Sequence, residues 1–425
     1  MIMSRLIAVL RQPDWLTRER AAAWSTVLFL QLVLLVVFIR LWLDGFLGDI
    51  ASTTSNDFVS FYAAGKLTLA GTPALAYDQA AHYLAEQKAT TPGVPYILFF
   101  YPPVFLLLCA ALAKLPYMVA YLLFQAVTLG LFMGVMRSIL REKGVAWIPP
   151  LLAFPAVLWT IGLGQNAFLT AALFGAFTLL IDRRPARAGL LIGLLCYKPH
   201  FGLLVPVALV AGQHWRALLT ASLTVAALTA ASIVVLGWET WQAYIPALGG
   251  SGAIYASGHI AFAGMVTPFA AALMLGLAVP YAYIAQAIVT LCMVVLTALV
   301  WRGGAASPPR GAGLLAATLL AIPLALVYDE LLLLVAIAWL VREGRAHGFL
   351  PWEKISLLAT YPLSLVTWTL GRTWHVPLGP VIGLIVLFWC LRRVWLTGRP
   401  RSQASRAAGE PSGGAIGQPA AASAG

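Results

Sequence analysis

The chain has 425 residues, of which 61% are hydrophobic and only 10% are charged. Soluble domains carry about 25% charged residues, so this composition excludes an ordinary water-soluble protein and predicts an all-α, polytopic integral membrane protein. The apolar runs are long and unbroken, unlike the short alternating strands of a membrane β-barrel. The net charge of +12 comes from basic residues scattered at the ends of apolar runs, which indicates membrane loops and no nucleic-acid partner.

The N-terminal segment 1–20 contains four arginines and no cleavage site, so we expect a cytoplasmic arm and not a signal peptide. The apolar run 21–43 is long enough for a first transmembrane helix. Over 21–396 we expect a membrane-embedded domain with about 10–13 transmembrane or half-spanning helices. The tail 397–425 is rich in Ala, Gly, Ser and Pro, and we expect it to be cytoplasmic and disordered.

Basic residues indicate the orientation of the chain. If the arginine-rich loops face the cytoplasm together with the N-terminus, 21 of the 27 Lys and Arg residues lie inside, as the positive-inside rule requires. Lys114 is unplaced, and the basic residues left outside are Arg40, Lys66, Lys88, Lys198 and Arg372. The runs 188–212 and 312–341 then form short hairpins with polar apices on the outer face. The run 102–115 enters the membrane with or without crossing it.

The segment 44–101 is too long for a simple connector and predicts a first extracytoplasmic loop with its own structure. Within it, 57–70 places aromatic residues and small residues on one helical face, and 75–89 alternates Leu and Tyr with polar residues. We expect both pieces to be amphipathic helices on the membrane surface.

Asp57 stands at the start of the first of these helices and has two interpretations. Together with Ser55 and Asn56, it is a typical helix cap. Alternatively, a carboxylate at the membrane boundary can accept a proton from a sugar hydroxyl as a general base.

Lys198 and His200 flank Pro199 between two short apolar runs. A lysine at membrane depth is costly and indicates a functional site, here an anionic phosphate of a substrate. The alternative is a snorkelling lysine at a loop apex.

Further candidate site residues are also polar residues that interrupt apolar runs. Asp329 could orient a substrate hydroxyl or pair with Lys198 or Arg372. Adjacent Glu330 should point elsewhere, since neighbouring helical residues are about 100° apart. Gln165 and Asn166 could bind a sugar, although Asn166 could equally cap the next helix. Arg372 and His375 are further phosphate candidates.

Cofactor and metal motifs are missing from the sequence. The four cysteines are isolated within apolar segments, and the remaining histidines have no partner at metal-ligand spacing. No phosphate-binding loop or dinucleotide fingerprint is present. We therefore expect neither a metal nor a cofactor.

Several motifs in this order resemble one known family. They are Asp57-Phe58-x-x-Phe61-Tyr62-Ala63-Ala64-Gly65 with Tyr77-Asp78, then Tyr101-Pro102-Pro103, Gly164-Gln165-Asn166, Lys198-Pro199 and Tyr328-Asp329. This pattern resembles the signature of glycosyltransferase family 87 over roughly residues 20–395. The tyrosines of the motifs, Tyr62, Tyr101 and Tyr328, are accordingly candidates for substrate binding.

The resemblance implies a multi-spanning GT-C fold and a polyprenyl-phosphate-dependent hexosyltransferase, with mannose as the favoured sugar. It implies that Asp57 activates the acceptor, that the anomeric centre is inverted, and that the site faces away from the cytoplasm of a bacterial inner membrane. The expected partners are a polyprenyl-phosphate-linked sugar donor, a glycolipid or glycan acceptor and the bilayer. The alternative from the residues alone is a transporter or flippase of a lipid-linked sugar, because broken helices with charges also suit that role.

Overall fold

The computed structural model describes residues 2–44, 57–249, 262–303 and 308–397. Within these residues the secondary structure comprises 19 α-helices, five short 3₁₀ helices and a single isolated β-bridge. The all-α prediction is confirmed. The predicted tail lies outside the described residues from 398 onward, as do the cap candidates Ser55 and Asn56.

Among the described residues, five helices are long and apolar enough to cross a membrane. They are α2 (Arg18–Asp44), α7 (Tyr117–Leu140), α13 (Trp215–Leu236), α17 (Val279–Arg302) and α21 (Gly379–Thr397). The shorter apolar helices are α6 (Pro103–Ala113), α10 (Ala167–Leu180), α11 (Pro185–Gly193) and α12 (Val205–Ala211). At 1.5 Å per residue these cannot cross a hydrocarbon core of about 30 Å alone. The multi-pass prediction with half-spanning helices is confirmed.

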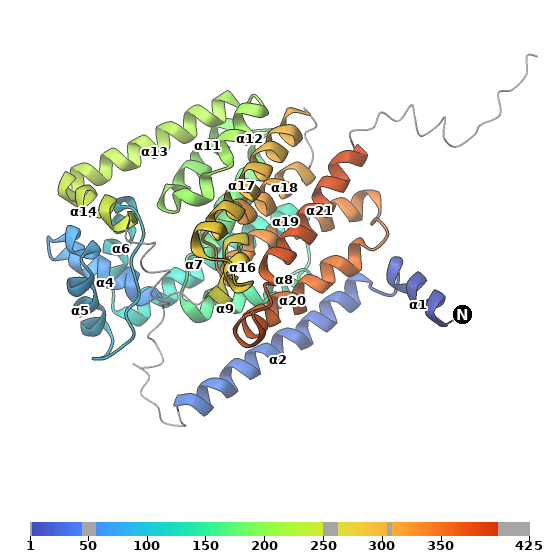
Figure 1. Cartoon of the computed structure of the whole chain (residues 1–425), viewed down its shortest axis with the longest axis horizontal. Coiled ribbons are helices and arrows are strands. Elements are labelled where there is room, and N and C mark those ends of the chain that lie inside the picture. The colour runs from blue at the N-terminus through green and yellow to red at the C-terminus, as the bar shows by residue number, and fades with distance from the viewer. Residues whose placement is uncertain (1, 45–56, 250–261, 304–307, 398–425) are drawn as a thin grey trace, which may run out of the picture.

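Two of the long helices flank the bundle. α13 runs along its upper edge and α2 along its lower edge (Figure 1). Both expose large apolar side chains, including Leu34 on α2 and Leu223 and Val234 on α13. Apolar surface of this extent is stable only against other apolar material, so these faces are the ones that contact lipid.

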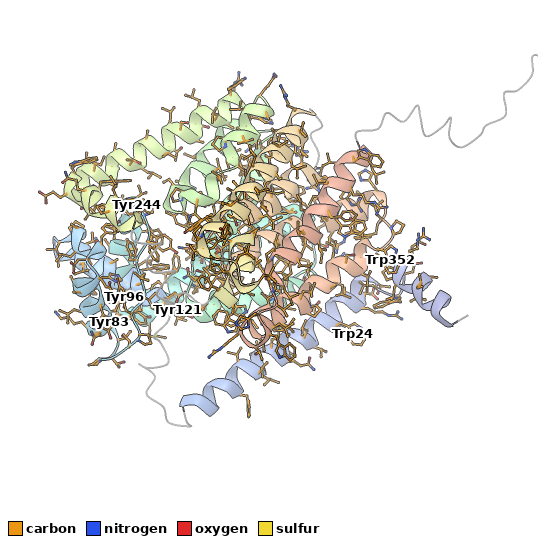
Figure 2. All side chains as sticks on the ribbon, viewed as in Figure 1. Trp24, Tyr83, Tyr96, Tyr121, Tyr244 and Trp352 are labelled. Atoms are coloured by element: carbon orange, nitrogen blue, oxygen red, sulfur yellow. The ribbon has the colours of Figure 1, made fainter. Side chains whose placement is uncertain are left out.

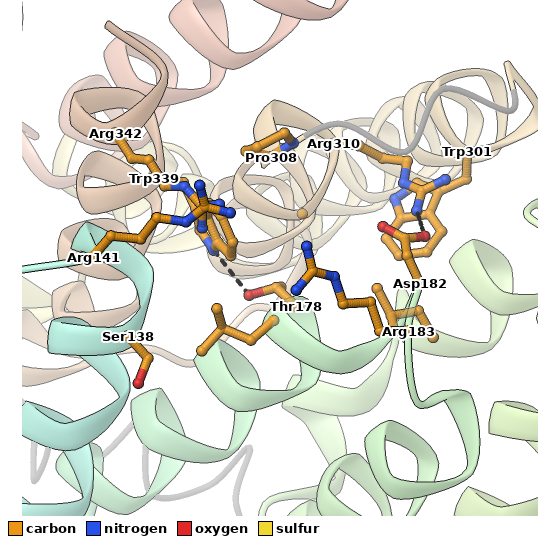
Figure 3. A pocket seen from close by; sticks show the side chains of 13 residues that line it. Ser138, Arg141, Thr178, Asp182, Arg183, Trp301, Pro308, Arg310, Trp339 and Arg342 are labelled. Carbon is orange, nitrogen blue, oxygen red and sulfur yellow. Dashed lines mark hydrogen bonds and ion pairs between the residues drawn. The ribbon is translucent and has the colours of Figure 1, made fainter. Parts of the chain in front are cut away.

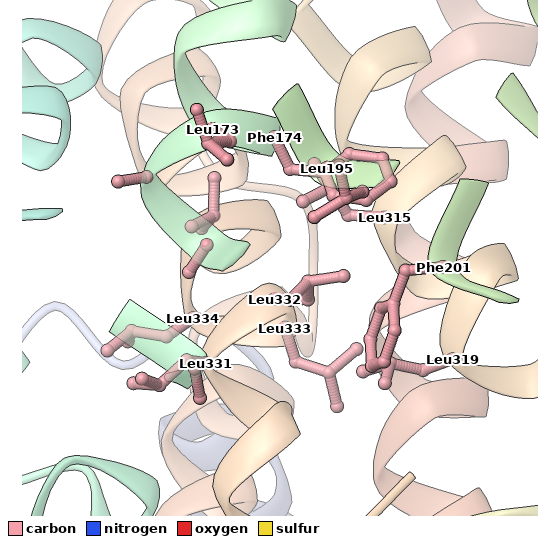
Figure 4. Close-up of a cluster of buried hydrophobic side chains, with 14 of the residues drawn as sticks. Leu173, Phe174, Leu195, Phe201, Leu315, Leu319, Leu331, Leu332, Leu333 and Leu334 are labelled. Carbon is pink, nitrogen blue, oxygen red and sulfur yellow. The ribbon is translucent and has the colours of Figure 1, made fainter. Parts of the chain in front are cut away.

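A buried hairpin forms the centre of the molecule. α18 (Pro308–Ala321) and α19 (Leu331–His347) are joined by a 3₁₀ turn, Val327–Glu330. Every residue from Pro309 to Ala321 and from Leu331 to Leu340 is buried. Leucines of α19 and α18 pack against α10 and the chain around Phe201 (Figure 4). The predicted hairpin with a polar apex is confirmed, and it is surrounded by protein.

The second predicted hairpin is broken at its apex. α11 is followed by two 3₁₀ turns, Leu194–Tyr197 and Pro199–Gly202, and then by α12. The residue before a proline is disfavoured in the helical region, and Lys198 accordingly has φ −125° and ψ 69°. The break therefore follows from Pro199, and it leaves Lys198 between two helix ends.

The first helix of the 44–101 segment differs from its prediction. α4 (Phe58–Leu69) is buried from Phe58 through Gly65 and packs against α6, so it does not lie on a membrane surface. The cause is Gly65, which lies on the aromatic face of the helix and, having no Cβ, allows the backbone of α6 to approach closely. α5 (Gln79–Ala89) keeps the amphipathic pattern, with a buried side at His82 and Glu86.

Aromatic side chains cluster at one end of the structure. Tyr83, Tyr96, Tyr121 and Tyr244 gather around α4 and α5 at one end of the structure (Figure 2). Their rings contact neighbouring aromatic residues, for example Tyr83 and Tyr96 with centroids 5.6 Å apart. The bounds of the remaining helices are α1 (Ile2–Arg11), η1 (Pro73–Tyr77), α8 (Ile148–Leu152), α9 (Pro155–Leu163), α14 (Trp238–Gly249), η4 (Phe262–Gly264), α16 (Pro268–Met274) and α20 (Glu353–Trp374).

Gly65 tests the close approach of α4 and α6. A Cβ at this position would lie 2.2 Å from the backbone oxygen of Cys109, so Gly65→Ala should force the helices apart. Overpacking of this kind costs about 1–3 kcal/mol, and we expect a clear fall in the melting temperature of the purified protein. Gly130→Ala in α7 is the control, because nothing lies within 4 Å of its added Cβ. Equal melting temperatures for the two variants would contradict the packing.

Candidate functional site

Asp57 contacts a residue far away in the sequence and does not cap its own helix. It occupies the N-cap position of α4, but its side chain makes no cap hydrogen bond. Instead, Nε2 of Gln165 donates to Oδ2 of Asp57 across 2.6 Å. The carboxylate keeps partial exposure among the described residues. The structure therefore favours the site interpretation of Asp57 over the capping interpretation.

Gln165 is held from several sides. Gly164 ends α9 in the left-handed conformation at φ 68°, which a glycine adopts without strain and which turns the chain toward Gln165. The backbone oxygen of Gln165 accepts a hydrogen bond from Nε2 of Gln125, at 3.1 Å. Its side-chain oxygen faces the hydroxyl of Tyr101 at 3.4 Å. A residue with so many constraints can fix the Asp57 carboxylate in one orientation.

Tyr101 joins the first motif of the chain to the later ones. Its backbone oxygen accepts a hydrogen bond of 2.9 Å from the hydroxyl of Tyr77. Its ring packs edge-on against Phe61, with centroids 5.1 Å apart. Asp78, the neighbour of Tyr77, caps α5 through Ala81 and so has a structural role.

Asn166 is fully buried beside Tyr101. Its amide acts on the Tyr101 hydroxyl at close range, but neither amide atom has a hydrogen-bond partner of normal geometry within the described part of the chain. It occupies the N-cap of α10 without a side-chain cap bond. Because buried polar groups are nearly always satisfied, this amide is available to a polar ligand.

Lys198 and Asp329 form a buried ion pair between the two broken hairpins. Nζ of Lys198 lies 3.0 Å from Oδ1 of Asp329, and both side chains are almost completely enclosed. The other oxygen of Asp329 accepts the backbone N–H of Leu326, at 3.1 Å. The ammonium also lies over the rings of Phe201 and Tyr328, at 5.1 and 5.5 Å. The predicted alternative in which Asp329 pairs with Lys198 is the one observed.

The electrostatic surroundings of Asp57 act in opposite directions. Burial raises the pKa of its carboxyl above the usual range, while the hydrogen bond from Gln165 and the positive charge of Lys198 lower it. The dominant effect is burial, so the carboxylate is more basic than an exposed one. A raised pKa brings a carboxylate closer to the range of an effective general base.

His82 and Glu86 of α5 form a buried polar pair, and His82 contacts α4. The ring Nε2 of His82 lies 3.1 Å from the backbone oxygen of Ser60, and its Nδ1 is 3.7 Å from Oε1 of Glu86. Burial lowers the pKa of His82 to about 4 and raises that of Glu86 to about 8, so both are neutral near pH 7. Since a negative Glu86 would repel Asp57, its protonation favours an ionised Asp57.

The remaining predicted residues divide into two groups. His200 adjoins the cluster, since the charge of Lys198 acts on it and its ring packs on Phe201. Tyr62 does not join it, because its hydroxyl donates to the backbone oxygen of Leu115, just after α6. Arg372 and His375 are exposed at the end of α20, and no contact among the described residues joins them to Lys198.

Glu330 points away from its neighbour Asp329, as predicted. Its carboxylate accepts a short hydrogen bond from the hydroxyl of Ser364 on α20. The two adjacent acids therefore do not form a dyad. Asp329 ties the apex of the central hairpin to Lys198, and Glu330 ties it to α20.

Sequence reasoning missed two residues around the cluster. Gln125 lies buried in the span α7 and holds the Gln165 loop. Tyr197 precedes Lys198, and its hydroxyl shares a 2.7 Å hydrogen bond with Thr170 of α10. A polar side chain in the middle of an apolar span is the signal that could have identified Gln125.

The arrangement brings a carboxylate, two side-chain amides and a cation together. Asp57, Tyr101, Gln165, Asn166, Lys198 and Asp329 come from five separate segments and meet at one end of the bundle. The described residues contain no group of three or more His, Cys, Asp or Glu suited to a metal ion. Carboxylate and amides can orient and deprotonate a hydroxyl, and the ammonium can attract an anionic oxygen.

Comparison with known proteins identifies one family. The family model for glycosyltransferase family 87 matches residues 99–327, which is more than half of the chain. In the same comparison, neither a curated protein nor a solved structure matches this chain. The matched segment includes Tyr101, Gln165 and Lys198, whereas Asp57 precedes it and Asp329 follows it.

The buried ion pair predicts a compensation between two substitutions. Lys198→Met leaves Asp329 charged and buried, which typically costs about 3–5 kcal/mol, so the melting temperature should fall sharply. Adding Asp329→Asn removes the stranded charge and should restore most of the loss, because Asn can still accept the Leu326 N–H. A double variant no more stable than Lys198→Met would contradict the coupling.

Proposed function

The chain belongs to glycosyltransferase family 87, a family of GT-C membrane enzymes, and we propose that it moves a hexose, with mannose favoured, from a polyprenyl-phosphate-sugar donor to a lipid or glycan acceptor. The observation that carries the mechanism is the bond from Gln165 to Asp57, a carboxylate on which the charge of Lys198 also acts. On this proposal Asp57 is the general base and the anomeric centre is inverted.

The proposed reaction begins with the acceptor hydroxyl near Asp57. The carboxylate takes the proton as the hydroxyl oxygen attacks the anomeric carbon, and the bond from that carbon to the lipid phosphate oxygen breaks. The phosphate leaves as an anion and needs no strong acid. Proton transfer by a positioned base contributes about 10²–10⁴-fold to a rate.

Lys198 is the residue we assign to the donor phosphate. An ammonium has three N–H donors, and Asp329 accepts at 3.0 Å from one side of it. The remaining donors can reach an anionic oxygen, with Phe201 and Tyr328 fixing the ammonium. His200 lies next to this position, whereas Arg372 and His375 do not enter the scheme.

The sugar is assigned to the amide side of the cluster. The unsatisfied amide of Asn166 and the hydroxyl of Tyr101 offer a donor and acceptors to sugar hydroxyls. Sites that hydrogen-bond a substrate hydroxyl discriminate strongly against analogues that lack it. This placement puts the sugar between the base and the phosphate site.

Charge supports a site on the extracytoplasmic face of a bacterial inner membrane. The arginine clusters of distant segments meet at the end of the bundle opposite to Asp57, where Arg18 and Arg345 both pair with Glu142. The positive-inside rule assigns that end to the cytoplasm. The cluster around Asp57 then opens outside, where lipid-linked sugar donors are used.

Removal of the base should abolish transfer. Asp57→Asn keeps the size of the side chain but cannot accept the proton, so we expect the transfer rate to fall by about 10²–10⁴-fold. The assay is transfer of a labelled hexose from a polyprenyl-phosphate donor by protein reconstituted in liposomes. Asp78→Asn is the control, since Asp78 caps α5 and should leave the rate within about twofold. Normal turnover by Asp57→Asn would remove Asp57 from the mechanism.

Loss of the Gln165 hydrogen bond should shift the pH profile. This bond lowers the pKa of Asp57 against the effect of burial, so Gln165→Leu should raise that pKa further. Less carboxylate is then ionised at a given acidic pH, and the acid limb of the transfer rate should move to higher pH while the rate at high pH recovers. Gln87→Leu, at an exposed turn contact, should leave the profile unchanged. A shift of the limb to lower pH would refute the assignment.

A further inference from the structure

A cavity of about 320 Å³ lies among arginines at the end of the bundle away from Asp57. It is lined by the C-terminal ends of α7, α10 and α19 and by the first turn of α18. α10 begins directly after Asn166 and reaches this cavity, so about 20 Å of helix separates it from the candidate active site. The proposed sugar transfer makes no use of it.

Four arginines and one carboxylate line this cavity: Arg141, Arg183, Arg310, Arg342 and Asp182. The carboxylate is already engaged. Asp182 pairs with the guanidinium of Arg310 at 2.5 Å and also lies 3.8 Å from Nε2 of His214. The other three arginines therefore have no acidic partner within the described residues of the cavity.

The three remaining guanidinium groups point toward a common space (Figure 3). Arg342 is fixed over the ring of Trp339 at 4.9 Å and donates to the backbone oxygen of Ile139 at 3.3 Å. The charges of Arg141 and Arg183 both act on it, opposed by that of Glu343, its neighbour in the chain. Like charges brought together in this way repel one another, and an anion placed between them relieves the repulsion.

Side-chain contacts hold the wall of the cavity that carries Arg310 and Arg342, whereas Arg141 and Arg183 line it as exposed residues. Nε1 of Trp339 donates to the hydroxyl of Thr178 at 2.9 Å, and that hydroxyl is also bonded to the backbone oxygen of Gly175. Arg310 is stacked over Trp301 at 4.4 Å. Both aromatic rings thus hold an arginine, and the volume lies within the range of small-ligand pockets.

We propose that Arg141, Arg183 and Arg342 form a binding site for a phosphate ester group at the end of the bundle opposite to the candidate active site. Guanidinium groups match the geometry of phosphate oxygens with parallel N–H donors, and the N-terminus of α18 adds a partial positive charge on the same wall. The phosphate can belong to the headgroup of an anionic lipid of the adjoining leaflet or to a small soluble compound.

Two binding measurements on the full chain in neutral detergent distinguish these sources. Equilibrium dialysis with labelled inorganic phosphate at constant ionic strength reports a soluble phosphate. Native mass spectrometry with phosphatidylglycerol and phosphatidylcholine reports an anionic headgroup against a zwitterionic one. Phosphate binding with displacement of phosphatidylglycerol supports a site open to both, and retention of phosphatidylglycerol alone supports the headgroup.

The decisive comparison is between arginines that line the cavity and a neighbouring arginine that does not. Arg141→Gln/Arg183→Gln removes two charged donors and should weaken the bound probe by about tenfold or more. Arg184→Gln is the matched control, because Arg184 follows Arg183 but does not line the cavity, and it should change binding by less than about twofold. The proposal is overturned if the two proteins bind both probes equally, or if neither probe saturates. Asp57→Asn should bind as the unaltered protein does, which separates this site from sugar transfer.

Discussion

The buried ion pair between Lys198 and Asp329 is the contact on which the rest of the architecture depends. Each charge stands at the apex of a helical hairpin that lies within the bundle, and neither could remain charged there alone. The pair therefore fixes the depth of both apices relative to each other. It also sets a positive charge at a defined place beside Asp57, whose carboxyl responds to it. The hydrogen bond from Gln165 then connects the segment before α4 to the same level of the bundle.

Breaks in the apolar sequence predicted where the charged residues of this cluster stand in the fold. Pro199 forces Lys198 out of a helix, and Asp329 interrupts an otherwise apolar stretch, so each residue stands where a chain reverses. Two reversals that begin from the same side of a membrane end on the same side, which places the residues at one level before any contact is known. The same reasoning placed Gln165 beside them. The breaks do not predict which residues pair, because sequence spacing alone left Asp329 able to pair with either Lys198 or Arg372.

The surface position expected for α4 was wrong, while the substrate-binding roles expected for Tyr62, Arg372 and His375 stay predictions; in each case the expectation came from one helix without its neighbours. α4 has aromatic residues on one side, which suggested a helix on the membrane surface, but that same side includes Gly65 and is buried against α6. That burial turns the hydroxyl of Tyr62 toward Leu115 and away from the site. Arg372 and His375 were expected on the same face of the membrane as the cluster, but both are exposed at the end of α20 and do not contact Lys198 among the described residues. Tertiary packing decided each case.

The charges of the site suit a reaction in which negative charge moves from a carboxylate to a phosphate. Before transfer, Asp57 and Asp329 carry one negative charge each against the single positive charge of Lys198, and a donor phosphodiester adds another. On the proposed mechanism, Asp57 takes the acceptor proton and becomes neutral, while the departing phosphate gains the charge that the sugar bond had masked. Lys198 acts on Asp57 and, on our assignment, on the phosphate, so its stabilisation passes from the one to the other as the bonds change. Burial strengthens this exchange because the surroundings screen it poorly, and it makes a protonated Asp57 easier to form. The same enclosed pair that positions the hairpins thus also favours the charge distribution of the products.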